Sequence, residues 1–337
     1  MTKTLDIRDG GRLRTYGRPR ARTVLTGIAV MLQIVLFASA ARAQNFGAWS
    51  PAVSIDPNRQ LVNTAVNDGC PIEAPDGLTL FFASNRLDLG QPPPPHLDIW
   101  VAYRASEDEP WSEIERLPGP VNTLANEFCP TPLPGNRLMF VSTRPSPCSG
   151  PLTPATADIY ITQHHPVRGW LEPKPLCGVN STADEFSPSF VEAGGVTMLY
   201  FSSSRTGIQK IYVSIMQGDG TWGTPSPVDE LNAAGAVDAR PNVRKDGLEI
   251  VFDSTRGDPA NSNSDIFTST RTSLSQPWSP PRRLGANVNS ATAAESRPSL
   301  SRDGTRLYFG STRANVLGSA GADIFVSTRS GPGKKKP

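Results

Sequence analysis

The sequence has few histidines and none of the short catalytic motifs that mark common enzyme classes. Its three histidines, His96, His164 and His165, fall in stretches that we expect to be solvated loops. We find no Gly-x-Ser-x-Gly nucleophile elbow, no His-Glu-x-x-His zinc motif and no phosphate-binding loop. The sequence therefore gives no support for a serine hydrolase, a zinc protease or a P-loop nucleotidase.

Long apolar stretches are also scarce, and the one candidate lies near the N-terminus. The run VLTGIAVMLQIVLFASA follows an arginine-rich segment and ends in ARAQ, with small residues at Ala41 and Ala43. This order of basic, apolar and small residues predicts a secretory signal over residues 1–43, cleaved after Ala43. An uncleaved membrane anchor is the alternative, although the run is shorter than the roughly 20 residues that a membrane-spanning helix needs.

A broad positive field is missing once this leader is set aside. The whole chain has 33 Lys and Arg against 31 Asp and Glu, and the leader contains 8 of the basic and 2 of the acidic residues. The remainder has 25 basic and 29 acidic residues, so it is mildly acidic. The last basic cluster, Lys334 to Lys336, belongs to a tail over 331–337 that we expect to be disordered. We therefore expect no nucleic-acid partner.

Turn-forming residues are abundant, whereas the sequence fits helices poorly. The chain has 33 Pro and 29 Gly, and one pattern occurs five times. It runs from an acidic residue through two further residues to Pro, then a turn, then an apolar strand ending in Ser-x-Arg. The five strand segments read LFFASNR, LMFVSTR, LYFSSSR, IVFDSTR and LYFGSTR. The pattern predicts one structural unit copied five times.

Each unit continues through a variable loop into an alternating strand and then a strand that begins with Trp, which makes four strands per unit. The fifth unit lacks its Trp strand, and the segment WSPAVSI beginning at Trp49 supplies one. We therefore predict an all-β, five-bladed β-propeller of four-stranded blades. Its N-terminal strand would complete the last blade, since closure of the ring removes exposed sheet edges. The propeller should cover residues 44–330, with blades near 64–118, 123–177, 181–229, 234–285 and 291–329 plus 46–56.

The order of Pro, Asp-Gly, Phe-x-Ser-x-Arg and Asp-Ile-aromatic resembles the WD-like repeat of TolB-type β-propellers, which occurs in many bacterial envelope proteins. The spellings VNS, DEFSP and GWLEP are similar to versions that accompany OmpA-like peptidoglycan-binding modules. The resemblance implies a propeller in the periplasm or outside the cell. TolB-type rings usually have six blades, so five repeats are a departure, and no role in Pal binding or colicin import is carried over.

The repeated acids should lie near one mouth of the channel, because the link into each inner strand reaches the same face of the ring. They are Asp68, Glu127, Glu185, Asp238 and Glu295. A ring of carboxylate oxygens suits a structural calcium ion. However, an Arg recurs in register with the acid in every unit, which favours ion pairs that lock the blades. We therefore expect no metal and no other cofactor.

Ligand-binding residues are sought where the repeat is broken, because a structural requirement is common to all blades whereas a ligand is not. The residue before each repeated Pro varies: Cys70, Cys129, Ser187, Arg240 and Arg297. The two arginines, on adjacent blades, could hold a carboxylate or a phosphate, or could pair with the carboxylate ring. Phe128 and Phe186, one position earlier in blades two and three, could stack against a sugar or cap the core.

Cysteine is scarce, and its spacing argues against a zinc site. The chain has four cysteines and no close Cys-x-x-Cys pair. An even number in an exported protein predicts disulfide bonds. Cys70 and Cys129 hold equivalent positions in adjacent blades, and Cys148 and Cys177 share a face of blade two, so we expect these two pairs.

These observations favour an exported monomer that binds a protein or an envelope glycan without catalysis. The binding surface would be the face with uneven loops, where Pro92 to Pro95 stiffen one loop, although loop drift explains such unevenness equally well. The alternative is a carbohydrate-active, glycosidase-like enzyme with its site at the channel mouth. Asp253 is its candidate carboxylate, as the one acid at its repeat position. A passive structural module with partner contacts on the blade rims is a third interpretation.

Overall fold

The computed structural model describes residues 46–57, 61–86, 96–148, 156–257, 263–313 and 321–333 of the chain. All of them belong to the larger of two compact units, Ala40–Pro337. The predicted signal, the prolines Pro92 to Pro95 and the tail Lys334 to Lys336 lie outside the described residues. Within the described ranges, no helix is long and apolar enough to cross a membrane.

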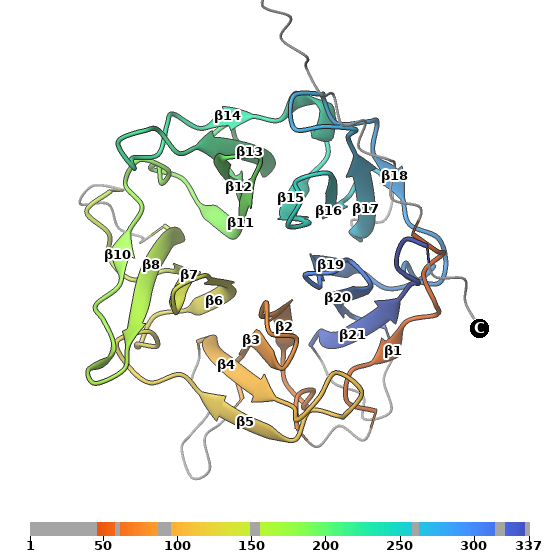
Figure 1. The fold of residues 1–337 in the computed structure, drawn as a ribbon, viewed down its shortest axis with the longest axis horizontal. Helices are drawn as coiled ribbons and strands as arrows, with labels where there is room; N and C mark the ends of the chain where they lie inside the picture. The colour runs from red at the N-terminus through yellow and green to blue at the C-terminus, as the bar shows by residue number, and fades with distance from the viewer. Residues whose placement is uncertain are drawn as a thin grey trace, which may run out of the picture. The chain divides into compact units, whose positions relative to one another are not determined.

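Five antiparallel sheets are arranged around a central channel, and each sheet presents one edge strand to it (Figure 1). We number these sheets as blades one to five in the order of their inner strands. The inner strands are β2 (Asp68–Glu73), β6 (Glu127–Leu133), β11 (Glu185–Ala193), β15 (Asp238–Val243) and β19 (Glu295–Leu300). The second strands are β3 (Thr79–Ser84), β7 (Arg137–Ser142), β12 (Val196–Ser203), β16 (Glu249–Ser254) and β20 (Arg306–Ser311). The prediction of an all-β, five-bladed propeller is confirmed.

The outer half of each blade is built from a third strand and a short fourth strand. The third strands are β4 (Asp98–Tyr103), β8 (Asp158–His165), β13 (Lys210–Ile215), β17 (Asp265–Thr270) and β21 (Asp323–Thr328). The outermost strands are β5 (Glu113–Arg116), β10 (Lys174–Pro175), β14 (Ser226–Pro227), β18 (Arg282–Arg283) and β1 (Val53–Ser54). Blade two carries an additional strand, β9 (Gly169–Trp170), and one 3-10 turn, Asp229–Leu231, follows β14.

The ring closes as the sequence predicts. Strand β1, near the N-terminal end, pairs antiparallel with β21 near the C-terminal end, and Val53 lies opposite Val326 (Figure 1). Trp49 packs against a buried cluster that contains Phe325. Closure therefore gives the last blade a fourth strand from the opposite end of the sequence, which protects its outer edge.

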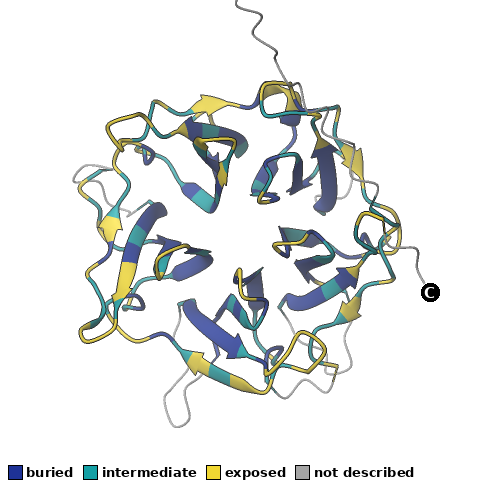
Figure 2. Cartoon of the chain, in the orientation of Figure 1, coloured by how far each residue is buried: buried dark blue, intermediate teal, exposed yellow. Residues whose placement is uncertain are grey.

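The core of each blade is a pair of aromatic side chains on the second and third strands, and these strands are largely buried (Figure 2). The second strand always supplies a Phe that has no exposed surface. The aromatic residue opposite it on the third strand completes the pair: Phe82 and Trp100, Phe140 and Tyr160, Phe201 and Tyr212, Phe252 and Phe267, Phe309 and Phe325. Burial of each Phe contributes roughly 2 to 3 kcal/mol, so these pairs stabilise every blade.

The repeated acid, Ser and Arg form one hydrogen-bonded unit in every blade. In blade one, Arg86 donates to Asp68 over 2.6 Å, to the hydroxyl of Ser84 over 2.9 Å and to the main-chain oxygen of Val62. The other blades repeat the pair as Arg144 with Glu127, Arg205 with Glu185, Arg256 with Asp238 and Arg313 with Glu295. All five carboxylates are fully buried. They therefore fasten the link between blades and do not open onto the channel.

The asparagine that precedes each repeated acid acts as an extra rung of the sheet. Asn122 accepts from the main-chain N–H of Ile99 over 2.8 Å and donates to the main-chain oxygen of the same residue over 2.9 Å. Asn63, Asn180, Asn232 and Asn289 make the same two bonds in the other blades. The side chain thereby satisfies the edge of the third strand where the fourth strand has ended.

Candidate functional site

A bulge in each inner strand shapes the channel. Each pairing between an inner strand and the second strand skips register just before the repeated Pro, as between Gly69 and Ile72. The residue at the skip has a positive φ in every blade: Cys70 50°, Cys129 47°, Ser187 49°, Arg240 53° and Arg297 54°. This left-handed backbone costs a side-chain-bearing residue roughly 1 to 2 kcal/mol. The bulge re-aims these five side chains, which all line the channel.

These residues form a narrow passage that we call the neck. Its free volume is about 30 Å³, and its other lining residues include the five repeated prolines, Pro71, Pro130, Pro188, Pro241 and Pro298. Among the described residues that line it, Arg240 and Arg297 are the charged ones. The neck therefore combines small apolar surfaces with basic groups, and it has space for a few atoms.

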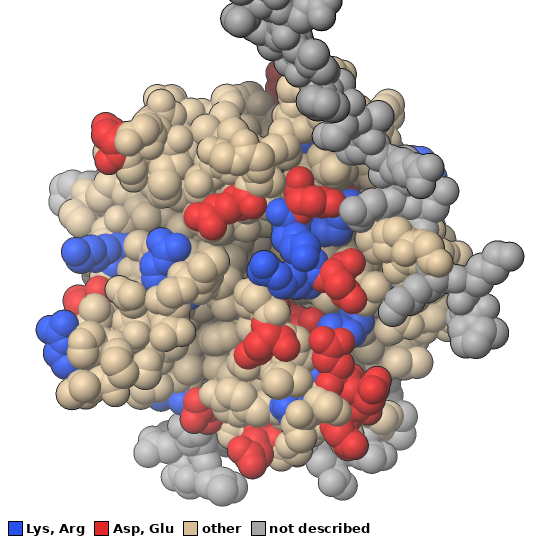
Figure 3. Space-filling model, in the orientation of Figure 1, with Lys and Arg blue, Asp and Glu red and all other residues tan. Residues whose placement is uncertain are grey.

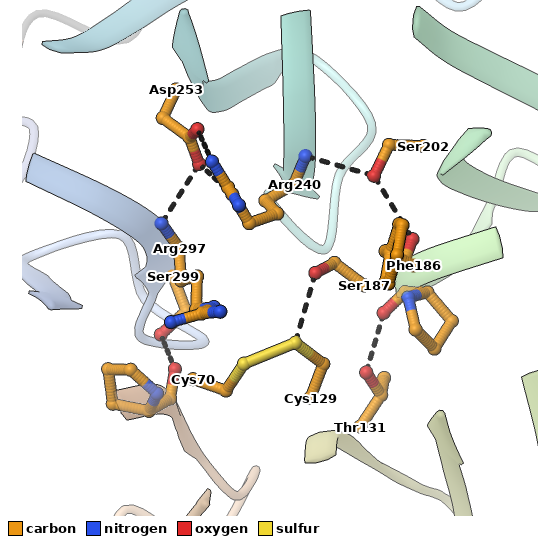
Figure 4. The surroundings of a disulfide bond; sticks show 12 residues. Cys70, Cys129, Thr131, Phe186, Ser187, Ser202, Arg240, Asp253, Arg297 and Ser299 are labelled. Atoms are coloured by element: carbon orange, nitrogen blue, oxygen red, sulfur yellow. Dashed lines mark hydrogen bonds and ion pairs between the residues drawn. A yellow bond between two sulfur atoms is a disulfide. The ribbon is translucent and has the colours of Figure 1, made fainter. Parts of the chain in front are cut away.

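Neighbouring blades are joined around the neck by a disulfide bond and by hydrogen bonds (Figure 4). A disulfide bond joins Cys70 to Cys129 between blades one and two, with the Cα atoms 4.8 Å apart. Thr131 donates to the main-chain oxygen of Pro188 over 2.5 Å, and Ser299 donates to that of Pro71 over 2.6 Å. The second predicted disulfide, Cys148 with Cys177, is also formed, within blade two. Disulfides indicate an oxidising compartment outside the cytoplasm.

The predicted ligand-binding arginines are brought together by Asp253. This residue lies on β16 and is fully buried. Arg240 donates to it from Nε over 2.7 Å and from Nη2, and the main-chain N–H of Arg297 donates to it over 2.9 Å (Figure 4). Burial opposes the charged form of Arg240, but the charge and hydrogen bonds of Asp253 outweigh it and raise the pKa of Arg240. Asp253 is thus withheld from solvent and does not line the neck.

The neck leads into a wider hollow on the face where the inner strands end. The hollow has a volume of about 510 Å³ and shares Ile72, Thr131 and Asn242 with the neck. Figure 3 shows basic side chains gathered at the channel mouth in that view, with acidic side chains beside them. The charged residues that line the hollow are Glu73, Glu192, Arg244, Lys245, Asp246 and Arg302. It is large enough for a sugar unit, which the neck is not.

Two of the carboxylates that line the hollow are accessible, whereas the third is clamped. Glu73 is buried and receives hydrogen bonds from Arg104, Arg306 and Tyr308. Burial of Tyr308, and then the charge of Glu73 and its hydrogen bond, raise the pKa of Tyr308 above the ordinary range. Glu192 is exposed, and Asp246 is partly exposed. Glu73 therefore joins blades five and one. Asp246 accepts hydrogen bonds from Arg244 and from the main-chain N–H of Leu248, and it keeps some surface open to the hollow.

The accessible carboxylates lie on neighbouring turns. Blade three has a longer inner hairpin, with nine residues in β11 and eight in β12, and Gly194 and Gly195 form its tip with φ of 57° and 78°. Two glycines with positive φ make the tight turn that suits the twist of a hairpin. A Cβ at Gly247, next to Asp246, would lie 3.6 Å from the Cβ of Ala193, next to Glu192. The two turns are therefore in close contact.

The sequence analysis did not predict Glu192 and Asp246 as site residues. It sought ligand-binding residues before the repeated prolines, whereas these two lie by the turns at the other end of the inner strands. The doubled Gly194-Gly195, where the other four units have an Asp-Gly or Gly-Asn turn, was the available signal. The two strands of this hairpin pair as far as Ala193 and Val196, which directly flank the two glycines. Glu192 in this hairpin is exposed and lines the hollow, while Asp246 belongs to an ordinary Asp-Gly turn.

Other residues singled out from the sequence lie elsewhere. Phe128 and Phe186 pack in a core cluster with ring centres 5.9 Å apart, and neither lines the neck or the hollow. His96 lies 3.9 Å from Asp98, and His164 packs edge-on against Trp170. No group of three or more His, Cys, Asp or Glu residues in the described part of the chain is arranged to hold a metal ion.

A second, larger groove of about 1040 Å³ lies over blades four and five. Two of its arginines lie over aromatic rings: Arg271 lies 4.3 Å from the ring centre of Trp278, and Arg329 lies 4.3 Å from that of Trp49. Glu249, which also lines it, receives hydrogen bonds from Arg244 and Arg329. These contacts close the ring, so we place the candidate site at the neck and hollow.

Comparison with known proteins gives structural matches only. Neither models of known protein families nor curated proteins match this chain. An α-L-arabinofuranosidase from Podospora anserina, solved with cellotriose, matches with TM-score 0.51 and 13% identity, covering 85% of this chain and 98% of that one. The arabinofuranosidase from Lactobacillus brevis has TM-score 0.51 and 13% identity, with 83% and 98% covered. A putative TolB from Agrobacterium tumefaciens reaches TM-score 0.46 and 16% identity, with 81% and 80% covered.

At these identities the likeness shows the shared propeller fold alone. The TolB match is too weak to carry an argument, so the TolB-type assignment stays a resemblance. The expectation of a non-catalytic binding module, and the preference against an enzyme, are wrong. They rested on the uneven loops of one face, whereas the structures that match the fold with TM-score 0.51 are arabinofuranosidases.

Proposed function

We propose that this propeller is a carbohydrate-active enzyme of the glycosidase type, with its substrate site in the hollow at the channel mouth. The observation that carries the proposal is the pair of accessible carboxylates, Glu192 and Asp246, on touching turns of adjacent blades. Hydrolysis of a glycosidic bond needs two carboxyl groups, one to protonate the leaving oxygen and one to activate water or attack the sugar. The matched arabinofuranosidases are named for the same class of reaction.

The surroundings of the two carboxylates suit different roles. Arg244 donates to Asp246 over 2.8 and 3.0 Å, which suits a carboxylate that accepts a proton from water or attacks the anomeric carbon. The Glu192 carboxyl is exposed, and within the described ranges no hydrogen bond or ion pair holds it, so it can approach the glycosidic oxygen and we assign it the acid role. Glu192 would give its proton to the glycosidic oxygen as that bond breaks.

The site of action is proposed to be the periplasm or the medium. The two disulfides support an extracytoplasmic compartment, and the predicted signal over residues 1–43 agrees with it. An envelope or extracellular glycan is then the substrate class within reach of the hollow.

Hydrolysis of aryl glycosides, beginning with an aryl α-L-arabinofuranoside, tests the proposal. We expect the purified protein to release the aryl alcohol, and Glu192→Gln and Asp246→Asn each to lower kcat by about 100-fold or more. Glu172→Gln, on an exposed residue away from the hollow, is the matched control and should keep wild-type kcat. Failure of the wild-type protein to cleave any member of an aryl glycoside panel, or full activity in both variants, would overturn the proposal.

A further inference from the structure

The guanidinium of Arg297 has no carboxylate partner among the described residues. Its Nε is buried and has no hydrogen-bond partner, and these residues make no ion pair with it. Arg240, its neighbour in the neck, is instead neutralised by Asp253. The neck therefore holds one positive charge more than the carboxylates around it can balance. An uncompensated charge away from bulk water is costly unless something else pairs with it.

The cost of this unbalanced charge is consistent with a lowered pKa of Arg297. Burial and the nearby charge of Arg240 lower the pKa of Arg297 to about 10, although Asp253 acts in the opposite direction. Arg297 stays protonated at neutral pH all the same. An anion beside it would offset both effects, because it would replace the lost hydration and screen Arg240.

The backbone directs this charge across the neck. Arg297 has a φ of 54°, and its Nη1 lies 3.4 Å from the position that a Cβ on Gly69 would occupy. The side chain thus reaches from blade five to blade one and lies beside Cys70 (Figure 4).

Further donors surround the same space. The hydroxyl of Ser187 donates to the sulfur of Cys129 over 3.2 Å, and sulfur is a weak acceptor that this hydroxyl can leave. Arg240 uses Nε and Nη2 on Asp253, so its Nη1 has no hydrogen bond to the described residues. Three side chains from blades three, four and five therefore offer hydrogen-bond donors in one passage.

The size of the neck selects the ligand group. A free volume of about 30 Å³ accommodates roughly two water molecules, which is the size of a carboxylate group and too small for a sugar ring. The neck opens into the hollow through Ile72, Thr131 and Asn242. A ligand can thus place one charged group in the neck and its remaining atoms in the hollow.

We propose that the neck is an anion site, in which Arg297 binds the carboxylate of a ligand whose body lies in the hollow. Arg240 and Ser187 supply further donors. Because the hollow is the substrate site of the proposed glycosidase, this inference makes the substrate an acidic sugar, a uronic acid unit in a glycan. That final step rests on the proposed function, whereas the anion site itself does not.

Calorimetric titration of the full chain at low ionic strength in chloride-free buffer tests the site. Acetate probes the carboxylate alone, glucuronate probes the sugar acid, and glucose probes the sugar without the charge. We expect glucuronate to bind at least tenfold more tightly than acetate and glucose. Arg297→Gln should weaken acid binding by tenfold or more, Arg297→Lys should weaken it less, and Arg168→Gln, which removes an exposed charge, should leave it unchanged.

Equal binding of both acids by wild type and Arg297→Gln would overturn the anion site, and so would the absence of acid binding to the wild type. Acid binding that Arg297→Gln abolishes supports the site even if glucuronate has no advantage over acetate; that result would overturn the acidic sugar. Titration requires no turnover, so a failed hydrolysis assay and a failed anion site are told apart. Circular dichroism of each variant confirms that it is folded.

Discussion

Asp253 accepts two hydrogen bonds from the guanidinium of Arg240, at Oδ1 over 2.7 Å and at Oδ2. The two residues belong to neighbouring strands of one blade, and Asp253 lies opposite Ala239, the residue before Arg240. Asp253 also receives the main-chain N–H of Arg297. One buried carboxylate therefore fixes the side chain of one basic neck residue and the backbone of the other, across two blades.

Replacing Asp253 with Asn should destabilise the protein strongly. The change leaves Arg240 and Arg297 as neighbouring charges with no carboxylate between them, and removing one partner of a buried pair costs about 3 to 5 kcal/mol. Urea unfolding should show this as a lower free energy of unfolding. Asp108→Asn, at an exposed position, should change it by less than about 0.5 kcal/mol. A loss below about 1 kcal/mol for Asp253→Asn would mean that the pair does not hold the neck.

Arg297→Met should stabilise the protein, in contrast to most substitutions. It removes an unbalanced charge from the neck and keeps a side chain of similar length. We expect a gain of about 2 kcal/mol in the free energy of unfolding near pH 7, less than the full pKa shift implies because water reaches the neck. A loss of stability in the absence of any anion would show that another group of the protein already compensates the charge.

The gain from Arg297→Met should shrink at high pH. Folding lowers the pKa of Arg297 from its ordinary value to about 10, so between the two values the unfolded chain holds more protons at this residue than the folded chain. As pH rises through this window, folded Arg297 loses its proton and the cost of its buried charge disappears. The free energy of unfolding of the wild type therefore approaches that of the variant. Guanidinium unfolding of both proteins at about pH 8 and about pH 11, on either side of the lowered pKa, measures the difference. A gap that stays constant contradicts the lowered pKa.

The neck disulfide should matter more for stability than the disulfide in blade two. Cys70 and Cys129 are 59 residues apart, whereas Cys148 and Cys177 are 29 apart. In the chain-entropy account, loops of these sizes correspond to about 4.2 and 3.6 kcal/mol. We expect thermal unfolding of the Cys→Ala double variants to follow that order. The reverse order would show that the neck is held mainly by its hydrogen bonds and not by the sulfur bridge.

Asn122→Ala should cost about 1 to 3 kcal/mol, because the change leaves the buried main-chain N–H of Ile99 without its partner. The main-chain oxygen of Ile99 loses the Asn122 bond but still accepts from the N–H of Leu117. Asn287→Ala, on an exposed residue with one hydrogen bond to Trp49, is the matched control and should cost less than about 1 kcal/mol. Equal costs for the two variants, measured by urea unfolding, would contradict the role of the repeated asparagine as a rung of the sheet.

The sequence by itself determined the repeat, the number of blades, the closure by the strand after Trp49 and both disulfide pairs. These features follow from local patterns that recur five times, so their spacing and register can be read along the chain. The sequence predicts the ion pairs between the repeated acids and arginines for the same reason, and the structure contains one in every blade. The bulge that places Arg240 and Arg297 in the neck is marked in the sequence by its proline alone. The sequence did not predict that the residue before this proline has a positive φ.

Only the tertiary structure decided which charges meet. Arg240 and Asp253 are close because a bulge and a strand pairing coincide. In the part of the chain that the structure describes, Arg297 has no carboxylate partner because the guanidinium of Arg240 already occupies Asp253. Glu192 and Asp246, 54 positions apart in the sequence, meet at touching turns of adjacent blades. Such encounters depend on side-chain directions across separate blades, which the order of residues along one strand does not contain.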